Sequence, residues 1–203
     1  MLTLFYSPTS PYVRKVVMVA IEKGIDDRLD KVPTNPWESG DKLLKNNPLS
    51  KVPCLVLDDG LTLFDSPVIC EYLETLSNSP VLFPPIGRDR WRSLRLQAQA
   101  DGIMDSAVLR VLEGKREESL RSADWVTRQK DAIDRTLDDI ESYAGDLSPT
   151  PTIGTISLAC ALGYLDLRHP GDEWRARAPK TAAWHEKFAK RDSYLQTEPP
   201  AGA

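Results

Sequence analysis

Two Ser-Pro pairs in the first third of the chain place a hydroxyl where a helix is expected to begin. Ser10 precedes Pro11. A residue before proline is pushed out of the helical region, as a helix N-cap must be, and proline suits the first helical position. The Ser10 hydroxyl and the free backbone N–H groups then lie at the positive end of the helix dipole, where an anion is stabilised. Taken alone, the pattern is more simply interpreted as a plain helix cap.

The second pair carries an acid in front of the serine. Asp65 precedes Ser66 and Pro67. A serine at a helix N-terminus offers a hydroxyl and an N–H to a carboxylate, and the aspartate accepts from an ammonium group. One site that takes both groups suits the α-amino acid end of a ligand, although a capped helix again explains the motif by itself.

A third motif precedes an apolar run. Val52 is followed by Pro53, and proline is tolerated as the first residue of a strand. A cis bond here would turn the Val52 N–H and C=O outward to pair with a peptide ligand. Only about 5–6% of X-Pro bonds are cis, so this motif is weak when it stands alone.

The elements that must position these motifs follow from the apolar pattern. Residues 2–6 predict a buried strand, and apolar residues at helical spacing after Ser10 predict a helix that ends near Gly24. Asp58-Asp59-Gly60 between two apolar runs predicts a hairpin. Weaker patterns predict a strand over 28–32, a short helix over 37–45 and a helix from Ser66. The predicted order is β-α-β-α-β-β-α, a mixed sheet covered by helices.

The rest of the chain carries only helical patterns. We predict a first domain over 1–78, a linker over 79–87 and an all-helical domain over 88–203. Residues 152–168 are apolar almost all round, which is typical of the buried central helix of a bundle. The other predicted helices cover 88–119, 125–143 and 179–191.

Composition excludes several classes of function. The 203 residues carry a net charge of −4 and 41% hydrophobic residues, and no basic block is present to bind nucleic acid. No apolar run is long enough to span a membrane. Three cysteines and two histidines at wide spacing form neither a disulfide framework nor a metal site. We therefore expect a cytoplasmic protein without a metal.

Together the three motifs resemble the N-terminal half of the cytosolic glutathione S-transferase superfamily. The resemblance is carried by YSPTSPYVRK, NPLSKVPCLV and LFDSPVICEYL, and in the second half by ADGIMD and ISLACALGYLDLR. The chain looks like a bacterial member with a thioredoxin-like domain and an all-α C-terminal domain. Its serine stands where the tau, theta and zeta classes have their catalytic hydroxyl, and where the omega class and glutaredoxins have a cysteine.

The resemblance implies a role for each motif in binding glutathione as co-substrate. Ser10 would donate to the glutathione thiolate, with Thr9 as the alternative. The remaining glutathione contacts would come from Lys51, Val52 with a cis Pro53, Asp65, Ser66, Lys42 and, across a homodimer interface, Asp101. We expect Arg14, Lys15 and Lys51 to offset the repulsion between an acidic protein and an anionic ligand.

The electrophile pocket is the least determined part of the site. The residues expected to line it are Tyr6, Ser106, Leu109 and Arg110, each of which also suits the core or the surface. The expected activity is conjugation of glutathione to small electrophiles in detoxification. Isomerase, dehalogenase and peroxidase reactions, and a non-catalytic binding role, stay open. A thiol-disulfide oxidoreductase is disfavoured because position 10 holds no cysteine and no CxxC pair occurs.

One position departs from the pattern of the superfamily. A Ser/Thr-x-x-Asp capping box usually begins the central C-terminal helix, and here Thr155 stands where the acid is expected. We expect a weaker cap at this helix, by a fraction of the roughly 1 kcal/mol that a cap contributes.

Overall fold

The computed structural model describes residues 1–38 and 40–200 of the chain. Two units emerge from the contacts, one of residues 1–85 with 192–200 and one of residues 86–191. Residues 79–85, which the sequence predicts as a linker, lie in the first unit. Residues 192–200 also differ from the predicted division, which places them in the helical domain. They belong to the first unit, where α9 (Asp192–Leu195) packs on α1 (Pro11–Glu22).

The first unit is built on a four-stranded mixed sheet with the order β2-β1-β3-β4. β1 pairs in parallel with β2 and antiparallel with β3, which forms an antiparallel hairpin with β4. The predicted β-α-β-α-β-β-α order is confirmed. The strands are β1 (Leu2–Tyr6), β2 (Leu29–Pro33), β3 (Cys54–Val56) and β4 (Thr62–Leu63).

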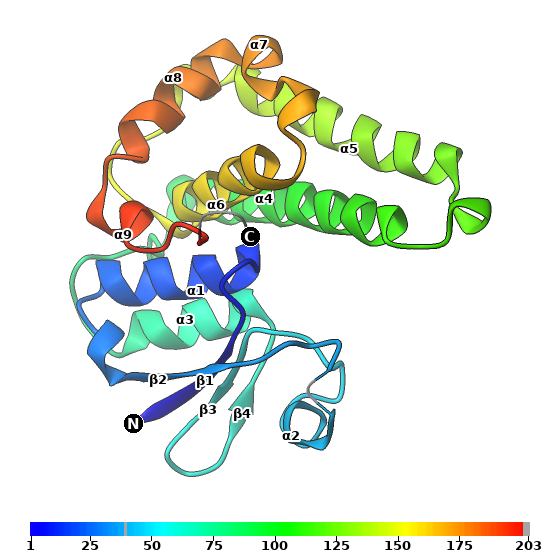
Figure 1. Cartoon of the computed structure of the whole chain (residues 1–203). Helices are drawn as coiled ribbons and strands as arrows, with labels where there is room; N and C mark the ends of the chain where they lie inside the picture. Colours follow the sequence, from blue (N-terminus) through cyan, green and yellow to red (C-terminus); the bar gives the residue numbers. More distant parts are fainter. Residues whose placement is uncertain (39, 201–203) are drawn as a thin grey trace. The chain divides into compact units, whose positions relative to one another are not determined.

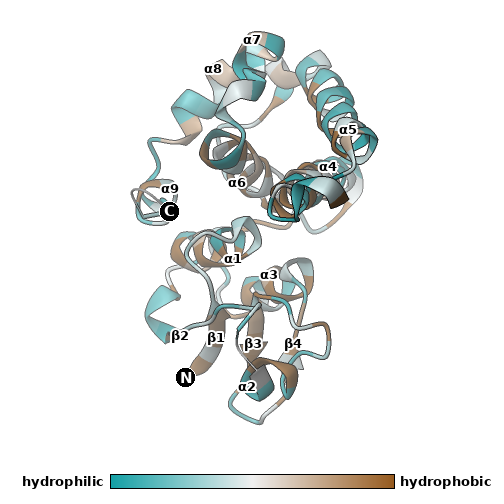
Figure 2. Cartoon of the chain, turned by 45° about the vertical axis from the view of Figure 1, so that its right-hand side comes forward, coloured by the Kyte–Doolittle hydropathy of each residue, from teal (hydrophilic) through white to brown (hydrophobic). Residues whose placement is uncertain are grey.

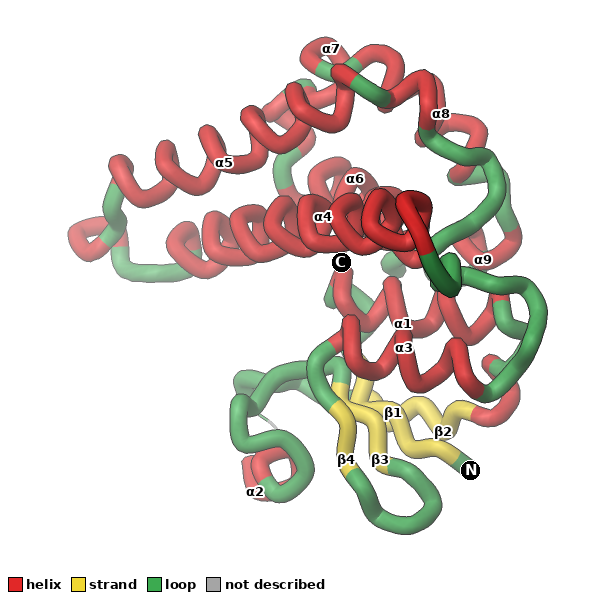
Figure 3. Tube along the Cα trace, turned by 180° about the vertical axis from the view of Figure 1, so that it is seen from behind, coloured by secondary structure: helices red, strands yellow, loops and turns green. Residues whose placement is uncertain are grey.

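Two helices, α1 and α3 (Ser66–Thr75), cover one face of this sheet (Figures 1 and 3). Both begin with the Ser-Pro pattern, with Pro11 and Pro67 in the first turn. Gly24 has a φ of +67°, the left-handed conformation that ends α1. The short helix α2 (Gly40–Leu44) lies at the end of the sheet away from the N-terminus (Figure 1).

A buried ion pair ties the segment after α3 to the first unit. The Lys23 ammonium lies 3.1 Å from the Glu74 carboxylate and donates to the Pro80 carbonyl at 2.6 Å. The same carboxylate accepts from the N–H groups of Leu82 and Phe83. Because each polar group has a partner, the charge of Lys23 is tolerated almost without solvent.

The second unit is helical. Its elements are α4 (Gly87–Gly114), η2 (Glu118–Leu120), α5 (Ala123–Ser142), η3 (Ala144–Asp146), α6 (Ile153–Arg168), η4 (Pro170–Asp172), α7 (Trp174–Arg177) and α8 (Pro179–Phe188), and a single turn, η1 (Asp26–Arg28), precedes β2 in the first unit. Every residue of α6 from Ile153 to Leu165 is buried, which confirms the prediction of a central helix. By contrast α5 is largely polar along its length and buries only one stripe (Figure 2). None of the helices described here has the length and apolar character needed to cross a membrane.

The N-terminus of α6 corrects the expectation of a weakened cap. The Thr155 N–H donates to the Thr152 hydroxyl at 3.2 Å, and the Thr152 N–H donates to the Thr155 hydroxyl at 2.7 Å. The capping box is therefore reciprocal with a threonine in place of the acid. The shorter threonine side chain still brings its hydroxyl oxygen within hydrogen-bond distance of the Thr152 N–H, so the acid is not required to accept this bond.

Candidate functional site

The strand register brings the three sequence motifs to one end of the sheet. In β1, Phe5 pairs with Cys54, so the end of β1 lies beside the start of β3. Leu55 pairs with Leu63, which places the end of β4 at the same end. The hairpin turn at 58–60 lies at the opposite end, where the N-terminal ammonium contacts the Asp58 carboxylate at 2.5 Å (Figure 1).

Each motif follows or precedes one of these strand ends. Ser10 comes after β1, the Val52-Pro53 pair comes before β3, and Asp65 comes after β4. Antiparallel pairing thus collects residues that are more than fifty positions apart in sequence. Their convergence at the positive ends of α1 and α3 suits a ligand with several anionic groups.

Ser10 is the N-cap of α1. Its backbone is extended, and its Oγ accepts the Val13 N–H at 3.3 Å. A serine hydroxyl has one proton to donate and two lone pairs, so capping uses only an acceptor position. Among the residues that the structure describes, the Ser10 hydroxyl has no acceptor for its proton. Thr9 lies one residue earlier, half-buried in the turn between β1 and α1.

The peptide bond between Val52 and Pro53 is cis, as the resemblance implied. The Val52 side chain is buried, and within 1–38 and 40–200 neither its N–H nor its C=O makes a hydrogen bond. Lys51, just before it, is exposed. This stretch therefore presents a free backbone donor and acceptor next to a lysine, which is what an extended peptide ligand pairs with.

Asp65 and Ser66 occupy the start of α3. Asp65 is the N-cap and is exposed, and its side chain makes no capping bond. Its carboxylate is therefore available to solvent. Ser66 is buried, and the peptide bond between Phe64 and Asp65 is cis.

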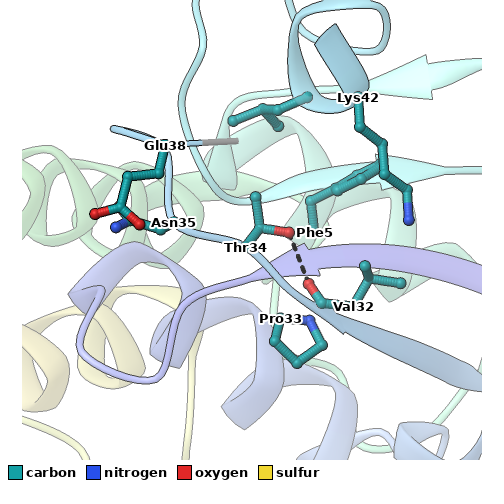
Figure 4. A pocket seen from close by; sticks show the side chains of 8 residues that line it. Phe5, Val32, Pro33, Thr34, Asn35, Glu38 and Lys42 are labelled. Atoms are coloured by element: carbon teal, nitrogen blue, oxygen red, sulfur yellow. Dashed lines mark hydrogen bonds between the residues drawn. The ribbon is translucent and has the colours of Figure 1, made fainter. Parts of the chain in front are cut away.

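A cavity of about 210 Å³ lies at the same end of the sheet, between the strands and α2 (Figure 4). Lys42 is one of its lining residues, with its ammonium 5.9 Å from the centre of the Phe5 ring. The sequence reasoning did not propose three polar lining residues, Thr34, Asn35 and Glu38. In the sequence, these residues are marked only by following the second predicted strand. Because β1 and β2 are parallel, the two strands end side by side, and residues after β2 lie near the end of β1.

Two of the three cations expected to attract an anionic ligand do not face solvent. The Lys15 side chain has no exposed surface, and Arg14 is only 7% exposed. The guanidinium of Arg14 donates to the Tyr194 carbonyl and to the Thr197 hydroxyl. Arg14 is covered by the segment 192–197, which packs on α1. Lys51 alone of the three stays exposed.

In the second unit the predicted residues Asp101, Ser106, Leu109 and Arg110 all lie on α4. Ser106 is buried and Leu109 is exposed. The Arg110 guanidinium forms a two-pronged pair with Asp172, at 2.5 and 2.9 Å. This pair holds the pKa of the Asp172 carboxyl below its ordinary value, chiefly through the hydrogen bond from Arg110. Arg110 thus serves an internal ion pair, and its role in an electrophile pocket stays a prediction.

His169 joins the end of α6 to α4. Its Nε2 lies 3.0 Å from the Ala107 carbonyl oxygen, to which it donates. Burial lowers the pKa of this imidazole, and the positive charge of Arg110 lowers it further. The histidine is therefore neutral in the folded protein at neutral pH and acts as a hydrogen-bond donor between two helices.

The part of the chain in view contains no cluster of three or more His, Cys, Asp or Glu side chains able to hold a metal ion. The three cysteines are buried and unpaired by disulfides. Burial raises the pKa of the Cys54 thiol to about 11, so this group is a poor nucleophile at neutral pH. These thiols are interior residues.

Two family models match the chain, and both describe glutathione S-transferases. The N-terminal domain model covers residues 9–76 and the C-terminal domain model covers residues 123–187. The first match spans all three motifs, from Ser10 to Ser66.

Individual relatives agree with the family models. The uncharacterised GST-like protein YibF of Escherichia coli K12 is 36% identical over 96% of both chains. A glutathione transferase family member of Pseudomonas fluorescens Pf-5, crystallised with bound glutathione, is 43% identical, with a TM-score of 0.94 over 99% of this chain and 100% of its own. A maleylacetoacetate isomerase of Pseudomonas aeruginosa PAO1 is 30% identical over 70% of this chain and 71% of its own.

Proposed function

We propose that this chain, which belongs to the glutathione S-transferase superfamily, binds glutathione as a co-substrate. The Ser10 hydroxyl would hold the glutathione sulfur as a thiolate. The observation that carries the proposal is the geometry of Ser10. Its oxygen accepts the Val13 N–H, and its proton is left to donate. The thiolate so held would lie at the N-terminus of a helix of twelve residues.

The available interactions match the energy that thiolate formation needs. A free thiol of this kind has a pKa of about 8.5, and lowering it to about 6.5 takes about 2.7 kcal/mol. A hydrogen bond to a charged group contributes roughly 1.5–3 kcal/mol, and a helix N-terminus adds about 0.3–2 kcal/mol. Neither a metal nor a general base is needed to reach the required value.

The rest of glutathione finds complementary groups among the other motifs. We assign the Val52 backbone to the cysteinyl part, because its N–H and C=O are without partners among the described residues. Asp65 and the N-terminus of α3, at Ser66, receive the ammonium and carboxylate of the γ-glutamyl end. Lys51 and Lys42 are the exposed cations for the glycyl carboxylate.

The reaction that follows is nucleophilic attack by the bound sulfur. The thiol proton leaves to solvent on binding, and the thiolate lone pair then forms a sulfur–carbon bond with an electrophile. With an aryl halide, halide departs with the bonding pair. We place the electrophile near Tyr6, the last residue of β1.

Substitution of Ser10 by alanine tests this assignment. Ser10→Ala should raise the pKa of bound glutathione toward the free value and lower the conjugation rate at pH 7 at least about tenfold, because a charge-assisted hydrogen bond is lost. The thiolate is titrated by its ultraviolet absorbance, and turnover is followed with a generic aryl halide.

Ser122→Ala is the matched control, because Ser122 caps α5 through the same contact, from the Trp125 N–H at 3.2 Å. Both variants should lose about 1 kcal/mol of stability, and only Ser10→Ala should change the pKa of the bound glutathione thiol. Equal thiol pKa values in wild type and Ser10→Ala would remove Ser10 from the role, and Thr9→Ala would then be measured.

Glutathione-dependent isomerisation is the second candidate, favoured by the similarity to the maleylacetoacetate isomerase. In that reaction the thiolate adds to a cis double bond and leaves again after rotation, so glutathione is not consumed. An assay that follows both glutathione and a cis-enone separates the two activities. Retention on immobilised glutathione without turnover of any electrophile would instead favour a binding role.

A further inference from the structure

Arg14 connects α1 to the C-terminal segment of the chain. Its Nη2 donates to the Tyr194 carbonyl at 3.1 Å, and its Nε donates to the Thr197 hydroxyl at 3.3 Å. The centre of the guanidinium lies 4.0 Å above the ring of Tyr194. Among the described residues, the hydrogen bonds and the ring contact of this guanidinium are all to the segment 192–197, which also belongs to the first unit.

A buried arginine is uncommon and requires several partners to offset the loss of hydration. Tyr194 is next to last in α9, so its carbonyl lies in the last turn of the helix, where carbonyl groups need partners from outside the helix. The Thr197 hydroxyl is itself fixed, because its single proton lies between the carbonyls of Ser193, at 2.7 Å, and Tyr194, at 3.1 Å. The planar guanidinium both stacks and donates, which a lysine cannot do.

The same residue also closes the first turn of α1. The Arg14 N–H donates to the Ser10 carbonyl at 3.0 Å, while the preceding Val13 N–H donates to the Ser10 hydroxyl. The first turn of a helix is its least supported part, because its own N–H groups have few intrahelical partners. A side chain anchored outside the helix at this position restrains the turn that carries Ser10.

A second tie holds the same segment at the other end of α1. The Ser193 hydroxyl lies 2.5 Å from a Glu22 carboxylate oxygen, to which it donates. Residues 192–197 are thus fastened along α1 at Arg14 and at Glu22, and α9 lies over α1 in Figure 1. The C-terminal segment is a strap on the helix whose N-cap is the proposed thiolate-binding group.

We propose that Arg14 is a positioning residue that acts through this strap: it keeps the first turn of α1 closed, and so holds the Ser10 hydroxyl at the angle needed to donate to the glutathione sulfur. This inference rests on the proposed function for its effect on the thiol. The attachment of the strap to α1 is a property of the free protein and is measured separately.

The experiment compares Arg14→Gln with Arg28→Gln, an exposed arginine of the same unit. Hydrogen exchange of the free protein should show the first turn of α1 exchanging at least about threefold faster in Arg14→Gln alone. With glutathione bound, the same variant should raise the thiol pKa and lower kcat/KM at pH 7 roughly threefold to tenfold. The rate should recover above the thiol pKa, where the thiolate forms without help.

Two further variants locate the effect in the strap. Tyr194→Leu removes the stacked ring, and Thr197→Val removes one acceptor and leaves the packing volume nearly unchanged. Each should raise the pKa of the bound thiol, as Arg14→Gln does. Combining either one with Arg14→Gln should raise this pKa little further. If Arg14→Gln destabilises the fold, Thr197→Val still carries the test.

The outcomes separate the two proposals. Unchanged hydrogen exchange and an unchanged thiol pKa in both Arg14→Gln and Thr197→Val would overturn the positioning role. A wild-type protein that does not lower the thiol pKa of glutathione would overturn the proposed function. Hydrogen exchange would still decide whether Arg14 and the strap restrain the first turn of α1.

Discussion

At the scale of single residues, Ser10 and Ser122 are chemically alike and differ in their surroundings. Both cap a helix with Oγ, at 3.3 and 3.2 Å from a backbone nitrogen. Ser10 follows β1 at the end of the sheet where two other helix and strand starts converge, whereas Ser122 links η2 to α5 in the helical unit. Capping needs a hydroxyl at a helix N-terminus, and holding an anion needs the same group with its proton free.

His169 supports a prediction about pH. Burial lowers its pKa in the folded protein, so the unfolded chain binds a proton more readily than the folded chain does. The free energy of unfolding should then fall as the pH drops below about 6.5, the ordinary value, and continue to fall until the folded-state pKa is passed. Urea unfolding between pH 7.5 and pH 5 measures this slope.

His169→Gln provides the comparison, because its amide nitrogen can still donate to the Ala107 carbonyl and does not titrate. The slope between pH 6.5 and 5 should become flatter in the variant. An unchanged slope would show that His169 does not contribute to the pH dependence.

At the scale of elements, the crossing of α4 and α6 depends on one glycine. A Cβ atom added at Gly154 would lie 2.5 Å from the Ser93 carbonyl oxygen and 3.0 Å from the Leu96 Cβ. The Gly154 N–H also donates to the Ser93 hydroxyl at 3.2 Å. The backbones of the two helices approach so closely that only glycine fits between them.

Gly154→Ala should therefore destabilise the protein by about 1–3 kcal/mol, since the helices must separate to admit the methyl group. Gly102→Ala on α4 is the matched control, because nothing lies within 4 Å of its added Cβ. The control should be neutral or more stable by up to about 1 kcal/mol, through helix propensity. Thermal and urea unfolding measure the stability of both variants. Equal stabilities would show that α6 can move away from α4 to admit the methyl group without loss of stability.

At the scale of the whole molecule, the family resemblance predicts a homodimer. Leu61, beside the edge strand β4, is an apolar residue that is 55% exposed, and we expect the partner subunit to cover it. Light scattering should give twice the chain mass of 22.7 kDa. Leu61→Glu should weaken self-association at least about tenfold, because a charge placed in an interface loses hydration.

Leu120→Glu serves as the control, at a leucine of η2 that is 59% exposed in the other unit. It should leave the mass unchanged. A chain that stays monomeric at all concentrations would contradict the homodimer, and equal effects of the two substitutions would exclude Leu61 from the interface.

The sequence by itself determined the features that depend on near neighbours. The Ser10-Pro11 cap, the hairpin around Gly60 and the buried helix α6 all follow from backbone preference or apolar period. The order of elements followed from the same signals. The three site motifs were recognisable because each is itself a local structure, a helix start or a strand start.

Only the tertiary structure decided which of these residues keep their charge in contact with solvent. Arg14 and Lys15 are as polar in sequence as Lys51, yet both are buried, and the segment 192–197 covers Arg14. The return of residues 192–200 to the first unit left no local signal, since it depends on contacts across some 180 positions. Long-range packing is set by the summed burial of many side chains, and no short window of sequence contains that sum.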